Sequence, residues 1–234
     1  MLLYKTINRV NPMETASDTV DVFRAIDWSL ADMGKMNVEN WGPYAYKPES
    51  RFYLLYDDEH FYLLLLTSGE YEKSPRKEVA DFQGSVCQDS CLECFLSFNP
   101  DSPLYLNIES NALGTPHVGL GEQRKGRKHL TAEEVSDLKI LPIKAGECSL
   151  SNLEFSYDWG LFIEIPLSFL AQFWPEIKET DKGFKSLRLG QAIRANFYKC
   201  GDLTPVPHFY TWAPIETAQP DFHQPAFFGH FVLG

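Results

Sequence analysis

Three stretches of the chain alternate aliphatic residues with polar ones: 92–99, 104–111 and 187–199. Successive side chains of a strand point to opposite faces, so each stretch would separate an aliphatic face from a polar face. The polar faces would carry Glu93, Asn107, Glu109, Asn111, Arg194, Asn196 and Tyr198. Carboxylates accept hydrogen bonds, guanidinium groups donate them and amides do both, which matches neighbouring sugar hydroxyls. The pattern therefore predicts a carbohydrate-binding face.

Aromatic residues in segments rich in Pro or Gly supply the second component of such a site. A sugar has an apolar C–H face that packs on flat rings, so sugar sites combine aromatic platforms with a few polar groups. The candidate platforms are Trp41, Tyr44, Tyr46, Tyr210 and Trp212. A tryptophan in a β-sandwich is more often a core residue than a platform, and that alternative stays open.

The elements that would position these residues are strands. Residues 51–56 and 60–66 are apolar and aromatic, and the acidic turn Asp57-Asp58-Glu59 between them predicts a β-hairpin. Further strands are expected at 92–99, 104–111, 153–157, 160–165, 187–199 and 227–233. One short helix is expected at 166–173, because Pro166 suits a first helical turn and Trp174-Pro175 ends it.

Many short strands with little helix predict an all-β fold, an antiparallel β-sandwich of jelly-roll or immunoglobulin-like type with one short helix. The chain has 234 residues, and it shows no internal repeat and no linker. Residues 1–234 are therefore expected to form a single domain.

The composition limits the kinds of partner. The formal net charge is −11 at pH 7, so a phosphate backbone would be repelled and nucleic-acid binding is not expected. The basic run at 124–129 follows Gly119 and Gly121 and is interpreted as a solvated loop. No apolar run approaches the roughly 20 residues of a membrane-spanning helix, and no secretory signal is visible at the start.

Cysteine usage bears on metal binding and on localisation. The chain has five cysteines, so internal pairing cannot be complete. Cys87, Cys91 and Cys94 have an iron–sulfur-like spacing, but the radical enzymes with that signature need an α/β barrel, which this pattern does not predict. No histidine nearby completes a zinc spacing. Cys94 is interpreted as a small buried hydrophobe and the others as unpaired thiols, which favours a reducing, cytoplasmic compartment.

Three segments near the C-terminus carry a more specific signal: 195–200 (ANFYKC), 207–212 (PHFYTW) and 220–229 (PDFHQPAFFG). Together with residues 88–96, 105–114 and 159–166, they resemble the family 9 carbohydrate-binding modules, in the branch described as carbohydrate-binding family 9-like. The resemblance implies a β-sandwich related to the redox-associated DOMON domains and a mono- or oligosaccharide ligand. It also implies a role in carbohydrate catabolism beside a glycoside hydrolase, often calcium as a structural ion, and permits an extracellular location.

In the well-known members of that family two tryptophans sandwich a terminal sugar. Trp212 stands at a motif position, and Trp41 is its expected partner because of its aromatic context. The motif also implies that His208 and His223 are structural hydrogen-bonding residues.

Two other classes of function stay open. Glu93 and Glu109 could act as the acid and base of glycoside hydrolysis, although Glu on such a polar face more often orients Arg194 or binds calcium. A haem domain of the related fold would need a Met/His or His/His pair, and the methionines all lie early in the chain, so no haem is expected. Asp57, Asp58, Glu59 and Asp221 are candidate calcium ligands, but they lack the calcium-loop pattern.

Overall fold

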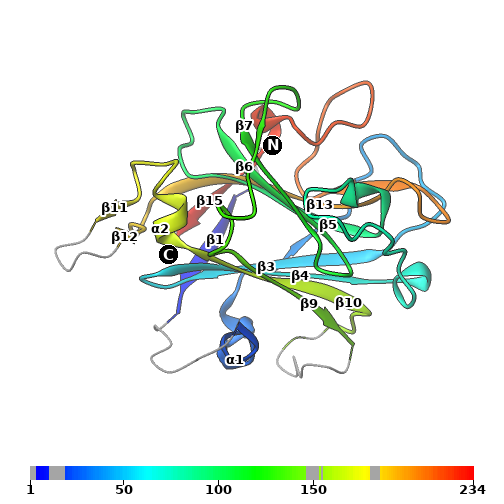
Figure 1. Ribbon diagram of the computed structural model, residues 1–234, viewed down its shortest axis with the longest axis horizontal. Coiled ribbons are helices and arrows are strands. Elements are labelled where there is room, and N and C mark those ends of the chain that lie inside the picture. The colour runs from blue at the N-terminus through cyan, green and yellow to red at the C-terminus, as the bar shows by residue number, and fades with distance from the viewer. Residues whose placement is uncertain (1–3, 11–18, 146–152, 154, 180–184) are drawn as a thin grey trace.

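The computed structural model describes the chain except for residues 1–3, 11–18, 146–152, 154 and 180–184. Its strands form one continuous sheet that curls over on itself, so that two halves, sheets A and B, face each other (Figure 1). β11 (Lys178–Glu179) and β12 (Lys185–Ser186) pair antiparallel in a separate two-stranded sheet.

Sheet A holds the strands that the sequence predicted to be half polar. Its order is β8-β7-β6-β5-β13-β15, with β14 also pairing with β13. The strands are β5 (Cys91–Ser97), β6 (Tyr105–Asn111), β7 (Pro116–Gly121), β8 (Lys128–His129), β13 (Ala192–Gly201), β14 (His208–Thr211) and β15 (Gly229–Leu233). All these neighbours pair antiparallel.

Sheet B contains the predicted hairpin. Its order is β3-β4-β10-β9, with β2 also pairing with β3. The strands are β2 (Gly34–Lys35), β3 (Glu49–Tyr56), β4 (His60–Ser68), β9 (Lys139–Lys144) and β10 (Trp159–Pro166). α2 (Leu167–Leu170) follows β10 directly and confirms the short helix expected there, although it is shorter than 166–173.

One strand joins the two sheets. β1 (Tyr4–Arg9) pairs with β15 of sheet A and with β3 of sheet B, and both pairings are parallel. The β-sandwich prediction is confirmed, but its description as antiparallel needs this correction. A strand at the N-terminus can pair parallel with β15 and β3 because the intervening chain supplies the long connections that parallel pairing requires.

The two sheets pack face to face over the main hydrophobic core. Sheet B contributes Phe52, Leu54, Leu63, Leu65, Leu161 and Ile163, and sheet A contributes Leu92, Cys94, Leu96, Ile108 and Phe197. All of these are 2% exposed or less, and the rings of Phe52 and Phe197 stack with centroids 3.9 Å apart. Cys94 is thus the buried hydrophobe that the sequence predicted.

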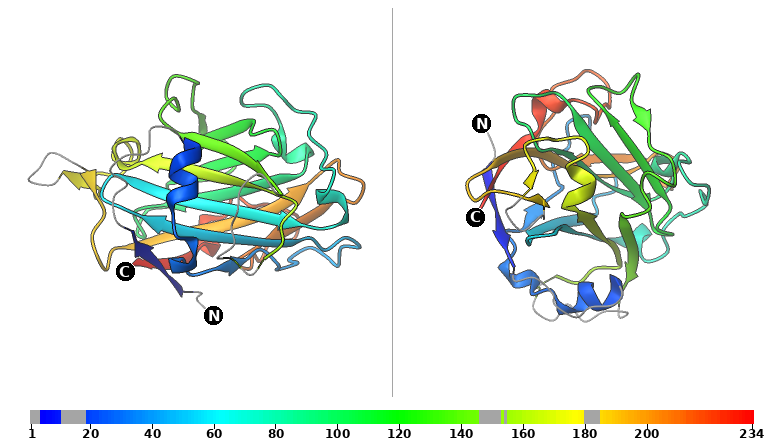
Figure 2. Two further views of the ribbon diagram at one scale, coloured as in Figure 1. Left: turned by 90° about the horizontal axis from the view of Figure 1, so that it is seen from below. Right: turned by 60° about the vertical axis from the view of Figure 1, so that its left-hand side comes forward.

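Both outer faces are also covered. On sheet B, α1 (Thr19–Ala25) and the 3₁₀ turn η1 (Trp28–Leu30) lie across the strands, with Phe23, Ile26 and Trp28 in a second core (Figure 2). α1 corrects the expectation of one helix. A strand covered on both faces needs apolar residues throughout, which explains the unbroken run of 61–66 in β4.

The outer face of sheet A is covered by loops and short 3₁₀ turns instead of a long helix. The covering turns include η2 (Glu70–Glu72), η3 (Val86–Gln88) and η4 (Pro225–Phe227). Val86, Ile215, Phe222 and Phe228 of the cover pack on Phe95, Tyr105 and Tyr198 of the strands in a third core. The polar face predicted from strand alternation is therefore an interior surface, and every residue of β5 and β6 is buried.

The strand predictions are confirmed at β3, β4, β5, β6, β10, β13 and β15, with ends that differ by a few residues. The strand expected at 153–157 is not found among its described residues; β9 pairs with β10 instead. The strand Lys139–Lys144 has the sequence KILPIK, in which the apolar residues do not alternate with polar ones and a proline stands in the middle, so period-two alternation did not indicate it.

Candidate functional site

Two adjoining hollows open on the loop-covered side of sheet A. The smaller has a volume of about 220 Å³ and is lined by Cys87, Glu93, Glu109, Arg124, Cys200, Asp202, Phe209, Pro220, Phe222 and His223. The larger, of about 710 Å³, lies between residues 100–103, 122–125 and 221–226 and also includes Arg194. Because Arg124 and His223 line both, we treat them as one site with an inner pocket and an outer pocket.

Two carboxyl groups stand side by side in the inner pocket. Glu93 of β5 and Glu109 of β6 are directly opposite each other in the antiparallel register, and both are buried. Burial, followed by the charge of Glu109, raises the pKa of Glu93 well above its usual range. Burial raises the pKa of Glu109 to about 7, against the opposing effect of Arg127 and Arg124. The sequence prediction that these two residues lie together is confirmed.

Asn107 orients one of these carboxyl groups. Its side-chain amide donates a hydrogen bond to Glu109 Oε1 at 2.9 Å, while its own Oδ1 is buried without a partner among the described residues. Asn107 and Glu109 share a face because they are two residues apart on one strand. Asn107 therefore acts on the pocket through Glu109.

Arg124 places a cation over the mouth of the site. Its Nε donates to Asp221 Oδ1 at 2.8 Å, and Gln224 donates to the other oxygen of the same carboxylate at 2.6 Å. Asp202, in the turn after β13, adds another carboxylate to the lining, and burial raises its pKa. The polar lining thus offers both donors and acceptors.

Aromatic rings form the apolar part of the inner pocket. Phe209 and Phe222 line it, with centroids 6.2 Å apart and planes at 68°. Trp41 packs behind Phe222 at 5.8 Å, and Tyr44 packs on Phe209 at 6.0 Å. The position of Trp41 is also fixed by a hydrogen bond, which its Nε1 donates to the carbonyl of Thr217 at 2.9 Å. The predicted platforms Trp41 and Tyr44 therefore support the lining rings.

His223 lines the inner pocket and contacts sheet A through Tyr105 of β6. Its Nδ1 lies 2.9 Å from the Tyr105 hydroxyl and 2.9 Å from Arg127 Nη1. Burial, assisted by the charges of Arg127 and Arg124, lowers the pKa of His223 to about 2. The ring is therefore neutral and serves as an acceptor, as the structural role expected from the motif requires.

The buried neutral ring makes stability depend on pH. The pKa of this histidine is about 6.5 in the unfolded chain and about 2 in the folded chain. The contribution of His223 to the free energy of unfolding is therefore fully present above pH 6.5 and is lost progressively as the pH falls from 6.5 towards 2. This one group should contribute about 1.4 kcal/mol per pH unit there. Urea unfolding at about pH 6 and pH 5 should show a shallower pH dependence for His223→Gln than for the unmodified chain. Equal slopes would contradict the assignment.

Four of the predicted site residues hold the structure together away from the pockets. Asn111 donates to Asp89 Oδ2 at 2.7 Å and fixes the loop before β5. Asn196 accepts from the backbone of Ala213 at 2.9 Å. The hydroxyls of Tyr198 and Tyr210 donate to the carbonyls of Phe222 and Tyr46, and Tyr210 also donates to Glu39. These groups face inward because loops cover the polar face of sheet A.

Trp212 is a core residue. It is 6% exposed, its ring lies 4.8 Å from that of Phe231, and it packs on Phe52 at 5.4 Å. A Cβ on Gly229 would come within 2.3 Å of the indole, so the backbone of β15 closes the remaining side. The ring has no face open to a ligand, which corrects its prediction as a platform in favour of the core alternative.

Arg194 belongs to the outer pocket. Its guanidinium donates to the carbonyls of Ser102 and Pro225 at 2.8 and 3.3 Å, and so links the two loops that form the rim. Its Nε is buried without a partner among the described residues. Burial lowers the pKa of Arg194.

The carboxylates considered for calcium are already engaged. Asp57 accepts from the backbone of Glu59 and His60 with one oxygen and from the Tyr62 hydroxyl with the other. Asp58 pairs with Arg9, and Asp221 is held by Arg124 and Gln224. Calcium takes six to eight oxygen ligands, and since Asp57, Asp58 and Asp221 already have partners within the protein, calcium binding stays a prediction.

Five residues of the two pockets are not among the ligand contacts predicted from the sequence: Arg124, Asp202, Phe209, Asp221 and Phe222. Arg124 opens the basic run that was interpreted as a solvated loop, yet it pairs with Asp221, 97 positions away. Asp202, Asp221 and Phe222 lie in loops, where strand alternation gives no signal, and Phe209 lies on the short strand β14, outside the three alternating stretches. Asp221 and Phe222 belong to the motif at 220–229, which indicated the family but not the pocket.

The comparisons with known proteins fit this architecture. The family model described as carbohydrate-binding family 9 matches residues 21–233. A crystal structure from Bacteroides uniformis ATCC 8492, provisionally described as a carbohydrate-binding protein, is 26% identical with a TM-score of 0.79, and each chain is covered in full. None of the curated proteins compared with the chain matches it.

Two complexes of one family 9 module from Caldicellulosiruptor kristjanssonii share the fold at 12% identity. The glucose complex has a TM-score of 0.56 and covers 99% of this chain and 96% of that one. The cellotriose complex has a TM-score of 0.57 and covers 99% and 93%. Among the described residues of the present chain, no helix is long and apolar enough to cross a membrane.

Proposed function

Because the chain belongs to carbohydrate-binding family 9, we propose that it is a non-catalytic carbohydrate-binding module whose inner pocket receives one sugar unit. The observation that carries the proposal is the lining of that pocket. Phe209 and Phe222 stand on one side, and Glu109, Arg124 and Asp202 supply acceptors and donors around them. Rings for the C–H face and directed polar groups for the hydroxyls are the two requirements of a sugar site.

The size and arrangement of the pockets support a terminal sugar with further units beside it. The inner pocket, of about 220 Å³, is of the size of one pyranose ring, and the outer pocket is about three times larger. Arg124 borders both, so one side chain would contact adjacent units. The outer rim carries Asp101, Gln123 and Gln224, which suit solvent-facing hydroxyls.

The related module bound to glucose and to cellotriose motivates the choice of β-glucosides as the first ligands. Its identity of 12% supports the shared fold alone, so a binding measurement has to establish which sugar the pocket prefers. We place the module in carbohydrate catabolism, beside a glycoside hydrolase that would act on the sugar it holds.

Calorimetric titration of the purified protein with glucose, cellobiose and cellotriose tests the proposal. Saturable binding is expected, with tighter binding of the oligosaccharides because they also reach the outer pocket. The same samples are assayed for newly released reducing ends. No binding to a broad set of sugars would overturn the proposal, and turnover that Glu93→Gln abolishes would favour glycoside hydrolysis instead.

A further inference from the structure

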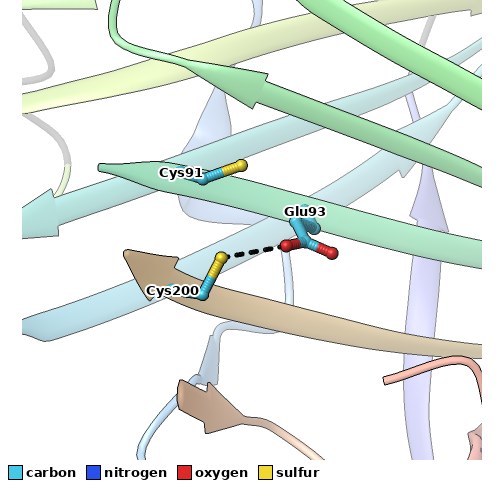
Figure 3. Close-up of side chains that lie close together, drawn as sticks. All are labelled: Cys91, Glu93 and Cys200. Atoms are coloured by element: carbon cyan, nitrogen blue, oxygen red, sulfur yellow. Dashed lines mark hydrogen bonds between the residues drawn. The ribbon is translucent and has the colours of Figure 1, made fainter. Parts of the chain in front are cut away.

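Three potential metal ligands from two neighbouring strands meet behind the inner pocket. The Sγ atoms of Cys91 and Cys200 and a carboxylate oxygen of Glu93 all lie within 4.8 Å of one another, and all three residues are buried. The thiol of Cys200 donates to Glu93 Oε1 at 3.0 Å. Figure 3 shows the side chains directed toward one another from β5 and β13.

Strand geometry fixes this arrangement. Cys91 and Glu93 are two residues apart on β5 and share its outer face, while Cys200 is the register partner of Cys91 on β13. Cys94 points to the opposite face, into the core between the sheets. The spacing of Cys87, Cys91 and Cys94 was therefore a misleading guide to metal binding, because the second thiol comes from 109 positions further on.

Acidic groups outnumber the cations that act on Glu93, since Glu109 and Asp202 stand against Arg124. Glu93 is 2% exposed, and within the described part of the chain no lysine or arginine lies at ion-pair distance from it. Glu109 and Asp202 line the same pocket as Glu93 and add negative charge close to it. A buried carboxyl group in a protein is expected to be paired, protonated or bound to a metal.

We propose that Cys91, Cys200 and Glu93 form a site for Zn²⁺. Two thiolates and one carboxylate are ligands that Zn²⁺ accepts in tetrahedral geometry. On binding, the metal would displace the protons now held by this cluster. The site shares Glu93 and Cys200 with the lining of the inner pocket, but its ligands do not include the sugar-contacting groups Arg124 and Asp202, and it does not depend on the proposed function.

The fourth coordination position faces the inner pocket. Glu93 and Cys200 line that pocket and Cys91 lies beyond its lining, so a metal held by all three would be reached from the pocket side. Cys87 also lines the pocket and is less buried than the other two thiols. Three protein ligands with an open position distinguish an accessible zinc site from a closed structural one.

Cobalt titration of the whole protein tests this site. The protein is kept reduced, stripped with a chelator and titrated with Co²⁺, which gives thiolate charge-transfer and visible bands when bound in a tetrahedral sulfur site. About one Co²⁺ per chain is expected, displaced by Zn²⁺, and Zn²⁺ should raise the melting temperature. Absence of thiolate bands at stoichiometric Co²⁺ would overturn the proposal without affecting the sugar site.

Single-residue variants show which side chains bind the metal. Cys200→Ser and Glu93→Gln are expected to lose or shift them, whereas Cys94→Ser is the matched control, on the same strand with its thiol on the other face. Circular dichroism checks that each variant folds. Bands that persist in Cys200→Ser and in Cys91→Ser would place the metal elsewhere and contradict the assignment.

Discussion

Replacing Lys199 with methionine is expected to lower the free energy of unfolding by about 3–5 kcal/mol. Lys199 is 0% exposed and its ammonium group lies 3.2 Å from Glu72, which is 1% exposed. The same carboxylate accepts from Trp159 Nε1 at 2.6 Å and from the Ser90 hydroxyl at 2.5 Å. Without the lysine these donors would face a buried charge that nothing neutralises.

The matched control removes both charges. In the double variant Lys199→Met, Glu72→Gln, the amide still accepts from Trp159, and no buried charge remains, so its stability should lie closer to that of the unmodified chain. Urea unfolding of the single and double variants gives the comparison. A loss below about 1 kcal/mol in the single variant would contradict the view that this pair is a buried ion pair.

Arg124→Met is expected to weaken sugar binding by about 10- to 100-fold, which corresponds to the loss of charge-assisted hydrogen bonds. Arg124 borders both pockets, and its side chain is 54% exposed, so the fold should be retained. Its charge also lowers the pKa of Glu109, which would become more fully protonated in the variant. Calorimetry with the tightest oligosaccharide measures the effect.

Lys128→Met is the matched control for this variant. It removes the same charge from the same basic run, but Lys128 pairs with Glu134 on the surface and lines neither pocket. Its affinity for sugar should equal that of the unmodified protein. Equal weakening by both variants would show a general charge effect and would remove Arg124 from the site.

Strand periodicity predicted the β-sandwich and correctly brought Glu93 and Glu109 together. It could not show that loops cover the polar face of sheet A, because the cover is made of irregular segments such as 73–90 and 213–228. Asn111, Asn196 and Tyr198 were therefore predicted as ligand contacts, whereas they bind the covering loops.

The remaining pocket residues depend on contacts that are distant in sequence. The Arg124–Asp221 pair joins two loops, and the Cys91–Cys200 pair joins two strands. The alternation of residue types within one segment carries no information on either pairing. Trp212 illustrates the reverse case, since the motif marks its position while the packing of Phe52, Phe231 and Gly229 decides that it is core.

The most direct test of the account is a crystal structure of the protein soaked with the sugar that binds most tightly. We expect one sugar ring in the inner pocket, with its C–H face against Phe209 or Phe222 and its hydroxyls within hydrogen-bond distance of Glu109 and Arg124. Further units should extend into the outer pocket. A sugar bound only elsewhere on the surface, with the inner pocket unchanged, would contradict the proposed site.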